Sequence, residues 1–233
     1  MSYLPAHAAA HDLYGAIHKG LRYAHARLLT RLGAVAPDNG AAVGELLAEL
    51  RAHLGVRACQ IDFERREILV PLETRAPGAV TELAEGHVRR LAHLPTLETL
   101  AAEVDLAKPL QREAALHRLY LAFSRFVADD LLQMAEEEEE FSPVLQALFT
   151  DAELVAMEAR MRGALPQQDL IDLARIMAPA ARPHERLALL RTVRQDMVRR
   201  AAPPEEFAVL LALGVRPVLT PADWALVETG LAA

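Results

Sequence analysis

Four ionisable residues interrupt apolar patterns of helical spacing, and all four are of types that bind metal ions: His18, Glu64, His87 and Glu137. Imidazole nitrogens and carboxylate oxygens together form binding sites for iron, manganese or zinc. A glutamine, Gln60 or Gln133, lies four residues before each glutamate and on the same helix face. Brought together, these side chains could hold one divalent metal ion. They could instead form a metal-free polar network, in which protonated histidines pair with the carboxylates and the glutamine amides satisfy the remaining groups.

Turn-forming sequences divide the first two thirds of the chain into four long segments. Breaks occur at 37–40, where Asp38 or Asn39 can cap the next helix, at 76–78 and at 105–109. The segments between the breaks have amphipathic helical patterns and cover about 8–35, 40–74, 78–103 and 109–149. Because short loops make consecutive helices antiparallel, we expect residues 1–149 to form an up-down-up-down four-helix bundle.

The four candidate ligands are expected at one level of this bundle. His18 and His87 lie about ten residues after the start of their helices, and Glu64 and Glu137 lie about ten and eleven residues before the end of theirs. In an antiparallel bundle these positions are at the same end, so the side chains should converge roughly 15 Å from it.

Other polar residues near these positions have less specific interpretations. His11 and His25 share the predicted core face of His18, and His11 is a weaker candidate ligand. We expect His53 and Arg57 to face solvent, as should most of the glutamate run 136–140 except Glu137. The same spacing places Leu91 and Val144 in the core, on the faces of His87 and Glu137.

The last third of the chain has a different pattern. Thr150 and Glu153 form a capping-box sequence, and prolines precede several short apolar-periodic stretches. We therefore expect residues 150–233 to form a helical subdomain. Its apolar residues are too many for so few short helices to bury, so it should pack on the bundle or contact a second chain, as a homodimer or with a protein partner.

Composition excludes several classes of protein. The chain has 233 residues, 52% hydrophobic and 5% aromatic, and Ala and Leu make up roughly a third of it, which favours an all-α fold. A net charge of −7 with scattered arginines argues against nucleic-acid binding, and a single cysteine argues against a disulfide framework. No apolar run is long enough for a membrane span and no secretory signal is evident, so a cytoplasmic protein is expected.

At this point the sequence resembles the hemerythrin-like (HHE cation-binding) family over about residues 8–149. The resemblance rests on the His-Lys-x-Leu-Arg sequence at 18–22, the two pairs that end at Glu64 and Glu137, and the Pro-Val-Leu sequence at 143–145. In that family the pairs are His-x-x-x-Glu, and with histidines of the first and third helices they hold a non-haem di-iron centre. Here the matching positions are His18, Glu64, His87 and Glu137.

The departures from the family concern its histidines. Gln60 and Gln133 replace two of them, and Arg90 and Leu91 stand where another is expected near His87. Since a glutamine carbonyl is a poor substitute for imidazole on iron, we expect no di-iron centre and no reversible oxygen binding.

No motif for a hydrolase, a transferase or nucleotide binding is present, so a non-enzymatic protein is expected. The sequence favours a regulatory or interaction protein with a buried polar network. The alternative is a mononuclear iron-, manganese- or zinc-binding protein that senses metal or oxygen.

Overall fold

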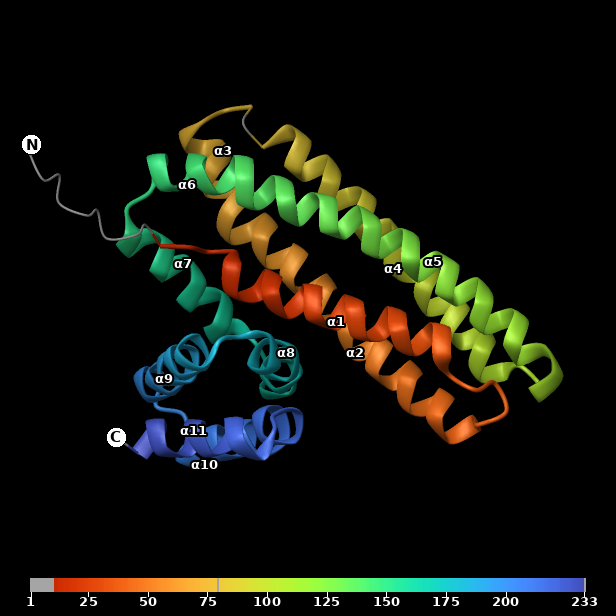
Figure 1. Ribbon diagram of the computed structural model, residues 1–233. Coiled ribbons are helices and arrows are strands. Elements are labelled where there is room, and N and C mark those ends of the chain that lie inside the picture. The colour runs from red at the N-terminus through yellow and green to blue at the C-terminus, as the bar shows by residue number, and fades with distance from the viewer. Residues whose placement is uncertain (1–10, 79, 233) are drawn as a thin grey trace, which may run out of the picture.

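The computed structural model describes residues 11–78 and 80–232, and these are helical, with no strand among them. The longest of the described helices are α1 (Gly15–Ala34), α2 (Gly40–Phe63), α4 (Thr81–Leu106) and α5 (Pro109–Glu136). They lie side by side in Figure 1, where α1 packs against α2 and α5, and α4 packs against the same two helices. Their apolar faces enclose a core that includes Leu28, Leu50, Leu97, Phe123 and Phe126.

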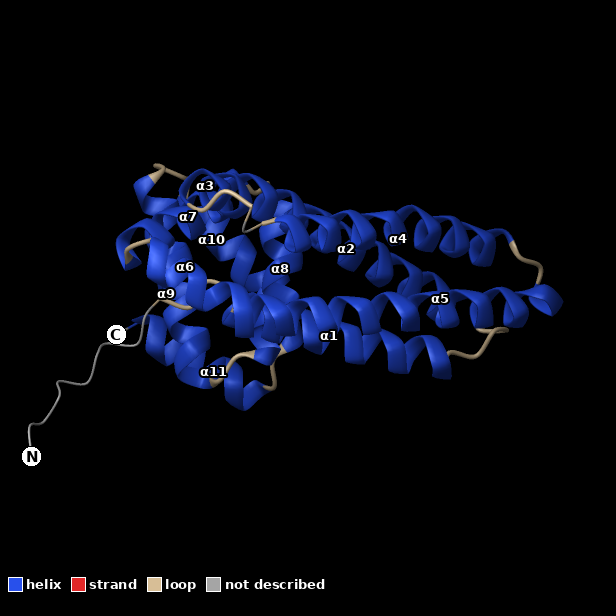
Figure 2. Ribbon diagram, turned by 90° about the horizontal axis from the view of Figure 1, so that it is seen from above, coloured by secondary structure: helices blue, strands red, loops and turns tan. Residues whose placement is uncertain are grey.

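The ends of these helices follow from local chemistry. The Asn39 side chain accepts a hydrogen bond from the Ala42 backbone N–H at 3.1 Å, so Asn39 caps α2. Pro109 occupies the first turn of α5, where its missing N–H costs no helical hydrogen bond. The connections between the helices are short, as Figure 2 shows.

Both α2 and α5 continue through a π-helical segment into a short α-helix. Residues Glu64–Leu69 lead into α3 (Val70–Arg75), and residues Glu137–Phe141 lead into α6 (Ser142–Leu148). Pro71 and Pro143 lie just after these segments, and a wider turn relieves the clash of a proline with the carbonyl four residues earlier.

The wider turn changes which residues enter the core after Glu137. Val144, expected in the core, is 37% exposed, and Leu145 is buried in its place. A π-helical turn holds one extra residue, so every later position is displaced by one. An unbroken period of 3.6 residues therefore gave a wrong prediction for Val144.

The remaining helices follow α6 after a turn. They are α7 (Asp151–Ala164), α8 (Gln167–Ala180), α9 (Pro183–Arg199), α10 (Pro204–Val209) and α11 (Pro221–Ala232), with a π-helical segment at Leu210–Val215 and a 3₁₀ turn at Arg216–Val218. The capping box predicted at Thr150 and Glu153 is confirmed, since both of its hydrogen bonds are present. No helix in the described ranges is long and apolar enough to cross a membrane.

The C-terminal helices pack against the long helices through α8, which contacts α1 and α2. Gly20 of α1 makes this approach possible, because a Cβ atom there would lie 3.0 Å from Cγ and 3.2 Å from Cα of Met177. At the edge of the contact, Lys19 pairs with Glu185 of α9 at 2.8 Å. Residues of the last third thus cover one side of α1 and α2.

Candidate metal centre

The structure brings His18, Glu64, His87 and Glu137 together in the interior. Each comes from a different long helix or its π-helical continuation, and each is at most 3% exposed. Nε2 of His18 lies 3.2 Å from Oε2 of Glu137, and Nε2 of His87 lies 3.2 Å from Oε2 of Glu64. Ligand atoms of His18, Glu64 and Glu137 all lie within 4.8 Å of one another. His87 is not part of this set and contacts it through Glu64 and, at 3.5 Å, Glu137.

The atoms that face one another in this cluster have no hydrogen-bond partner. They are Nε2 of both histidines and Oε2 of both glutamates. Buried polar atoms are rarely left unpaired, because the cost is that of a lost hydrogen bond. Atoms that share a metal ion at about 2.1 Å lie about 3.0–3.4 Å apart. The 3.2 Å spacings match that arrangement.

A second set of contacts fixes the orientation of these side chains. Nδ1 of His18 lies 2.8 Å from Oε1 of Glu138, and Arg22 holds Glu138 with two hydrogen bonds of 2.6 and 2.9 Å. An Nδ1–H that donates to Glu138 leaves Nε2 with a lone pair toward the centre, the arrangement in which histidines ligate metals. Sequence reasoning placed Glu138 in solvent, whereas it is half-buried.

Each glutamate has one oxygen held by protein and one that faces the cluster. Nε2 of Gln60 donates to Oε1 of Glu64 at 3.0 Å, and Nη2 of Arg90 donates to Oε1 of Glu137 at 3.2 Å. The protein thereby orients each Oε2 without occupying it. Glu64 and Glu137 are also the first residues of the two π-helical segments, a distortion that recurs at functional sites.

Next to the cluster lies a charged network that sequence reasoning missed. Asp130 accepts from Arg57 at 2.5 Å and from Arg90 at 3.2 Å, and its second oxygen lies 2.7 Å from Nε2 of His25. Nδ1 of His25 lies 3.1 Å from Nε2 of His53. Figure 1 places the helices that carry these residues around one interior.

Four residues in this region lie where the sequence analysis did not expect them. His53 is 3% exposed and Arg57 is fully buried, so the prediction that they face solvent was wrong. Arg90 is buried while Leu91 is 36% exposed, so the core face of α4 runs through the arginine and not the leucine. The sequence of α2 could have predicted the burial of Arg57. It lies on the core face, which repeats at alternating intervals of four and three residues through Leu50, Leu54, Arg57, Ile61 and Glu64.

The two glutamines and His11 take different positions. Gln60 accepts from Arg57 at 2.7 Å and so joins the charged network to Glu64. Gln133 is buried against Gly86, where a Cβ atom would lie 1.9 Å from its Oε1, and its Nε2 makes no hydrogen bond in the described structure. His11 lies outside the cluster, with Nε2 3.0 Å from Glu158 of α7.

The charges in this interior do not balance. Glu64, Glu137 and Asp130 contribute three negative charges, and Arg57 and Arg90 contribute two positive charges, which leaves one negative charge in excess. Burial raises the pKa of Glu137, but the nearby His18, His87 and Arg90 lower it by more, so that it falls from 4.5 to about 2. Burial alone lowers the pKa of His87, but the carboxylates of Glu137 and Glu64 raise it above its ordinary value. The interior thus attracts either a proton or a metal cation.

The histidines of the charged network respond differently. Burial lowers the pKa of His53, with further lowering from His25 and Arg57. Burial also lowers the pKa of His25, more than Asp130 raises it. Both rings are therefore neutral at pH 7, and the positive charge beside Asp130 comes from the arginines.

Comparison of the chain with protein-family models, curated proteins and solved structures found no match. The resemblance to hemerythrin-like proteins therefore remains a prediction from the residues.

Proposed function

We propose that this protein binds one divalent metal ion between His18, Glu64, His87 and Glu137 and acts as a metal-binding or metal-sensing protein. The observation that carries the proposal is the set of four buried atoms, Nε2 of the two histidines and Oε2 of the two glutamates, which lie 3.2 Å apart as His18–Glu137 and His87–Glu64 and make no hydrogen bond of good geometry. Two imidazoles and two carboxylates suit iron, manganese or zinc. We further propose that the four long helices form an up-down-up-down bundle of the hemerythrin-like type.

The sensing role follows from where the ligands originate. Each of the four comes from a different long helix or its continuation, so a bound ion would tie all four together. An ion that binds the folded chain and not the unfolded one stabilises the fold in proportion to its concentration. The bound metal would neutralise the excess negative charge, while Glu138 would hold the His18 ring in its ligating orientation.

The charged network supports one ion and not two. Beside Glu137, where a second ion would have to share its carboxylate, Arg90 already donates to Oε1 at 3.2 Å. Arg57 and Arg90 together place two fixed positive charges next to Asp130. A second divalent cation would be repelled by both guanidinium groups, and neither glutamine supplies the missing imidazole.

The second candidate function is a metal-free regulatory or interaction protein with a buried polar network. It is supported by the pairing of Asp130 and Glu137 with buried arginines, since such pairs can hold a core without metal. In that case a proton on His87 would balance the remaining charge. The C-terminal helices would contact a second copy of the chain or another protein, in the cytoplasm, and the acidic net charge of −7 disfavours a nucleic-acid partner.

The test compares metal affinity in two charge-matched variants of the full chain. Glu137→Gln removes a buried ligand, and Glu139→Gln removes an exposed carboxylate two residues away. Calorimetric titration of metal-free protein with Mn²⁺ and Zn²⁺ should give an affinity at least about 100-fold lower for Glu137→Gln and an unchanged affinity for Glu139→Gln. Equal affinities, or no binding by the parent protein, would support the metal-free network.

A further inference from the structure

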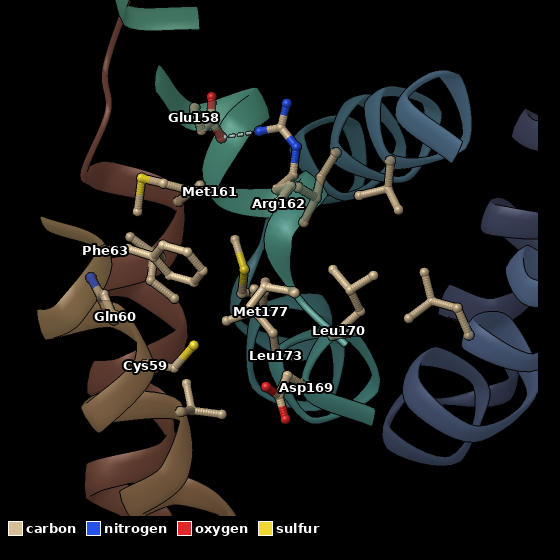
Figure 3. Close-up of a pocket in the computed structure, with 18 of the residues that line it drawn as sticks. Cys59, Gln60, Phe63, Glu158, Met161, Arg162, Asp169, Leu170, Leu173 and Met177 are labelled. Carbon is tan, nitrogen blue, oxygen red and sulfur yellow. Dashed lines mark ion pairs between the residues drawn. The ribbon is translucent and has the colours of Figure 1, made fainter. Parts of the chain in front are cut away.

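An apolar pocket lies between the long helices and the C-terminal helices, next to the polar cluster. Its volume is about 110 Å³, and its walls come from α1, α2, α7, α8 and α9. Figure 3 shows these side chains converging on one space; they include Phe63, Met161, Leu170, Leu173 and Met177. We propose that this pocket binds a small amphipathic amine, with the apolar body between the helices and the ammonium group at Asp169.

The walls favour an apolar occupant over water. A buried water molecule needs two to four hydrogen-bond partners, and most of the lining side chains offer none. A cavity of about 150 Å³ lined by similar side chains holds a benzene molecule. By the same measure, the smaller volume of this pocket has room for a group of about four carbons.

The polar groups at the pocket determine whether its ligand is a cation or an anion. Arg162 pairs with Glu158 at 2.6 Å and with Asp196 at 2.7 Å, so this cation is already neutralised. Asp169 also lines the pocket, and it makes no hydrogen bond or ion pair with any residue that the structure describes. Two carboxylates, those of Glu158 and Asp196, therefore neutralise Arg162, whereas the unpaired carboxylate of Asp169 is available to a cation.

Asp169 is reached from solvent and lies close to the apolar space. It is half-buried, as are Leu173 and Cys59 beside it, so this side of the pocket is open to a ligand. Burial and the carboxylate of Asp169 raise the pKa of the Cys59 thiol. The thiol therefore stays protonated at pH 7 and presents a weakly polar wall.

The pocket does not depend on metal binding. Gln60 lines its inner wall and donates to Glu64, so the two sites share this residue, but none of the four candidate metal ligands lines the pocket. Binding to the pocket can therefore be measured on the metal-free full chain, and its failure would leave the metal proposal intact.

The experiment is a calorimetric titration with three ligands that share a four-carbon chain: butylammonium, butan-1-ol and butanoate. Butylammonium should bind about tenfold more tightly than butan-1-ol, because a charge-assisted hydrogen bond to Asp169 adds to the same apolar contact, and butanoate should not bind measurably. No binding of butylammonium, or equal affinity for all three, would overturn the proposal.

Variants separate the pocket from a non-specific surface charge. Asp169→Asn should remove the preference for the amine, whereas Asp172→Asn, on the same helix but outside the pocket and paired with Arg175 at 2.9 Å, should retain it. Leu173→Trp should fill the space and abolish binding of both the amine and the alcohol. An amine preference that survives Asp169→Asn, or binding that survives Leu173→Trp in a folded protein, would contradict the assignment.

Discussion

Arg90 and Glu137 are in contact in the core, with Nη2 of the arginine 3.2 Å from Oε1 of the glutamate, and neither side chain is more than 2% exposed. The guanidinium occupies one oxygen of the carboxylate, and the other oxygen faces His18 at 3.2 Å. One carboxylate therefore links a fixed positive charge to the proposed metal position. Under the proposed function, this contact is the reason why the interior would accept one cation and not two.

Replacing Arg90 tests this contact. Arg90→Met should destabilise the metal-free protein by about 3 kcal/mol or more, because Glu137 and Asp130 each lose a buried partner. Arg89→Met, at an exposed neighbouring position, should change stability by less than about 0.5 kcal/mol. Urea denaturation measures both. Equal effects would mean that the buried contact contributes nothing specific.

Replacing Glu138 tests the orientation of His18. Glu138→Gln should lower metal affinity by about 10- to 100-fold, because the carboxylate that holds Nδ1 is lost while every ligand remains. Glu140→Gln, at an exposed position of the same acidic run, serves as the control. If the two variants bind Mn²⁺ alike, Glu138 does not position the ring.

Acid should destabilise the metal-free protein through Glu137. Its pKa is lowered from an ordinary value of 4.5 to about 2, since His18, His87 and Arg90 outweigh the effect of burial. The carboxylate therefore stabilises the fold fully above pH 4.5 and loses this contribution as pH falls toward 2, by roughly 3 kcal/mol in total. The free energy of unfolding of Glu137→Gln should fall less steeply over this range. If the free energies of unfolding of the parent and of Glu137→Gln fall equally steeply with pH, the Glu137 carboxylate is not stabilised by His18, His87 and Arg90.

Gly20 tests the contact of α8 with α1. Gly20→Leu should destabilise the fold by roughly 2 kcal/mol, because the added side chain meets Met177, whose Cα lies 3.2 Å from the position of a Cβ. Gly44→Leu adds the same side chain in α2, where nothing lies within 4 Å, and should be neutral or slightly stabilising. Thermal unfolding checks both, and similar melting temperatures would argue against close packing at Gly20.

Much of the helical organisation could be predicted from the sequence, because turn residues and helical periodicity mark it directly. Asn39, Pro109 and Thr150 each lie at a helix start, where the sequence suggested one. The π-helical segments could not be read in the same way. They arise where Pro71 and Pro143 meet a continuing helix, and the displaced register after Glu137 buries Leu145 and exposes Val144.

The candidate ligands were found because ionisable residues on apolar faces stand out in a helical pattern. Their partners were not found, because arginines are most often exposed and the core face that carries His87 was assigned through Leu91. Burial of Arg57 and Arg90 depends on Asp130, a partner 73 and 40 residues away. Such a pairing becomes visible only when the helices are placed side by side.

The most direct test of the central claim is the number of divalent ions bound per chain. The full chain, purified without affinity-resin metal and stripped with a chelator, would be titrated with Mn²⁺ and Zn²⁺ by calorimetry, and bound metal would be counted by mass spectrometry after dialysis. We predict one ion per chain, with heat that disappears in Glu137→Gln. No uptake, or two ions per chain, would contradict the account.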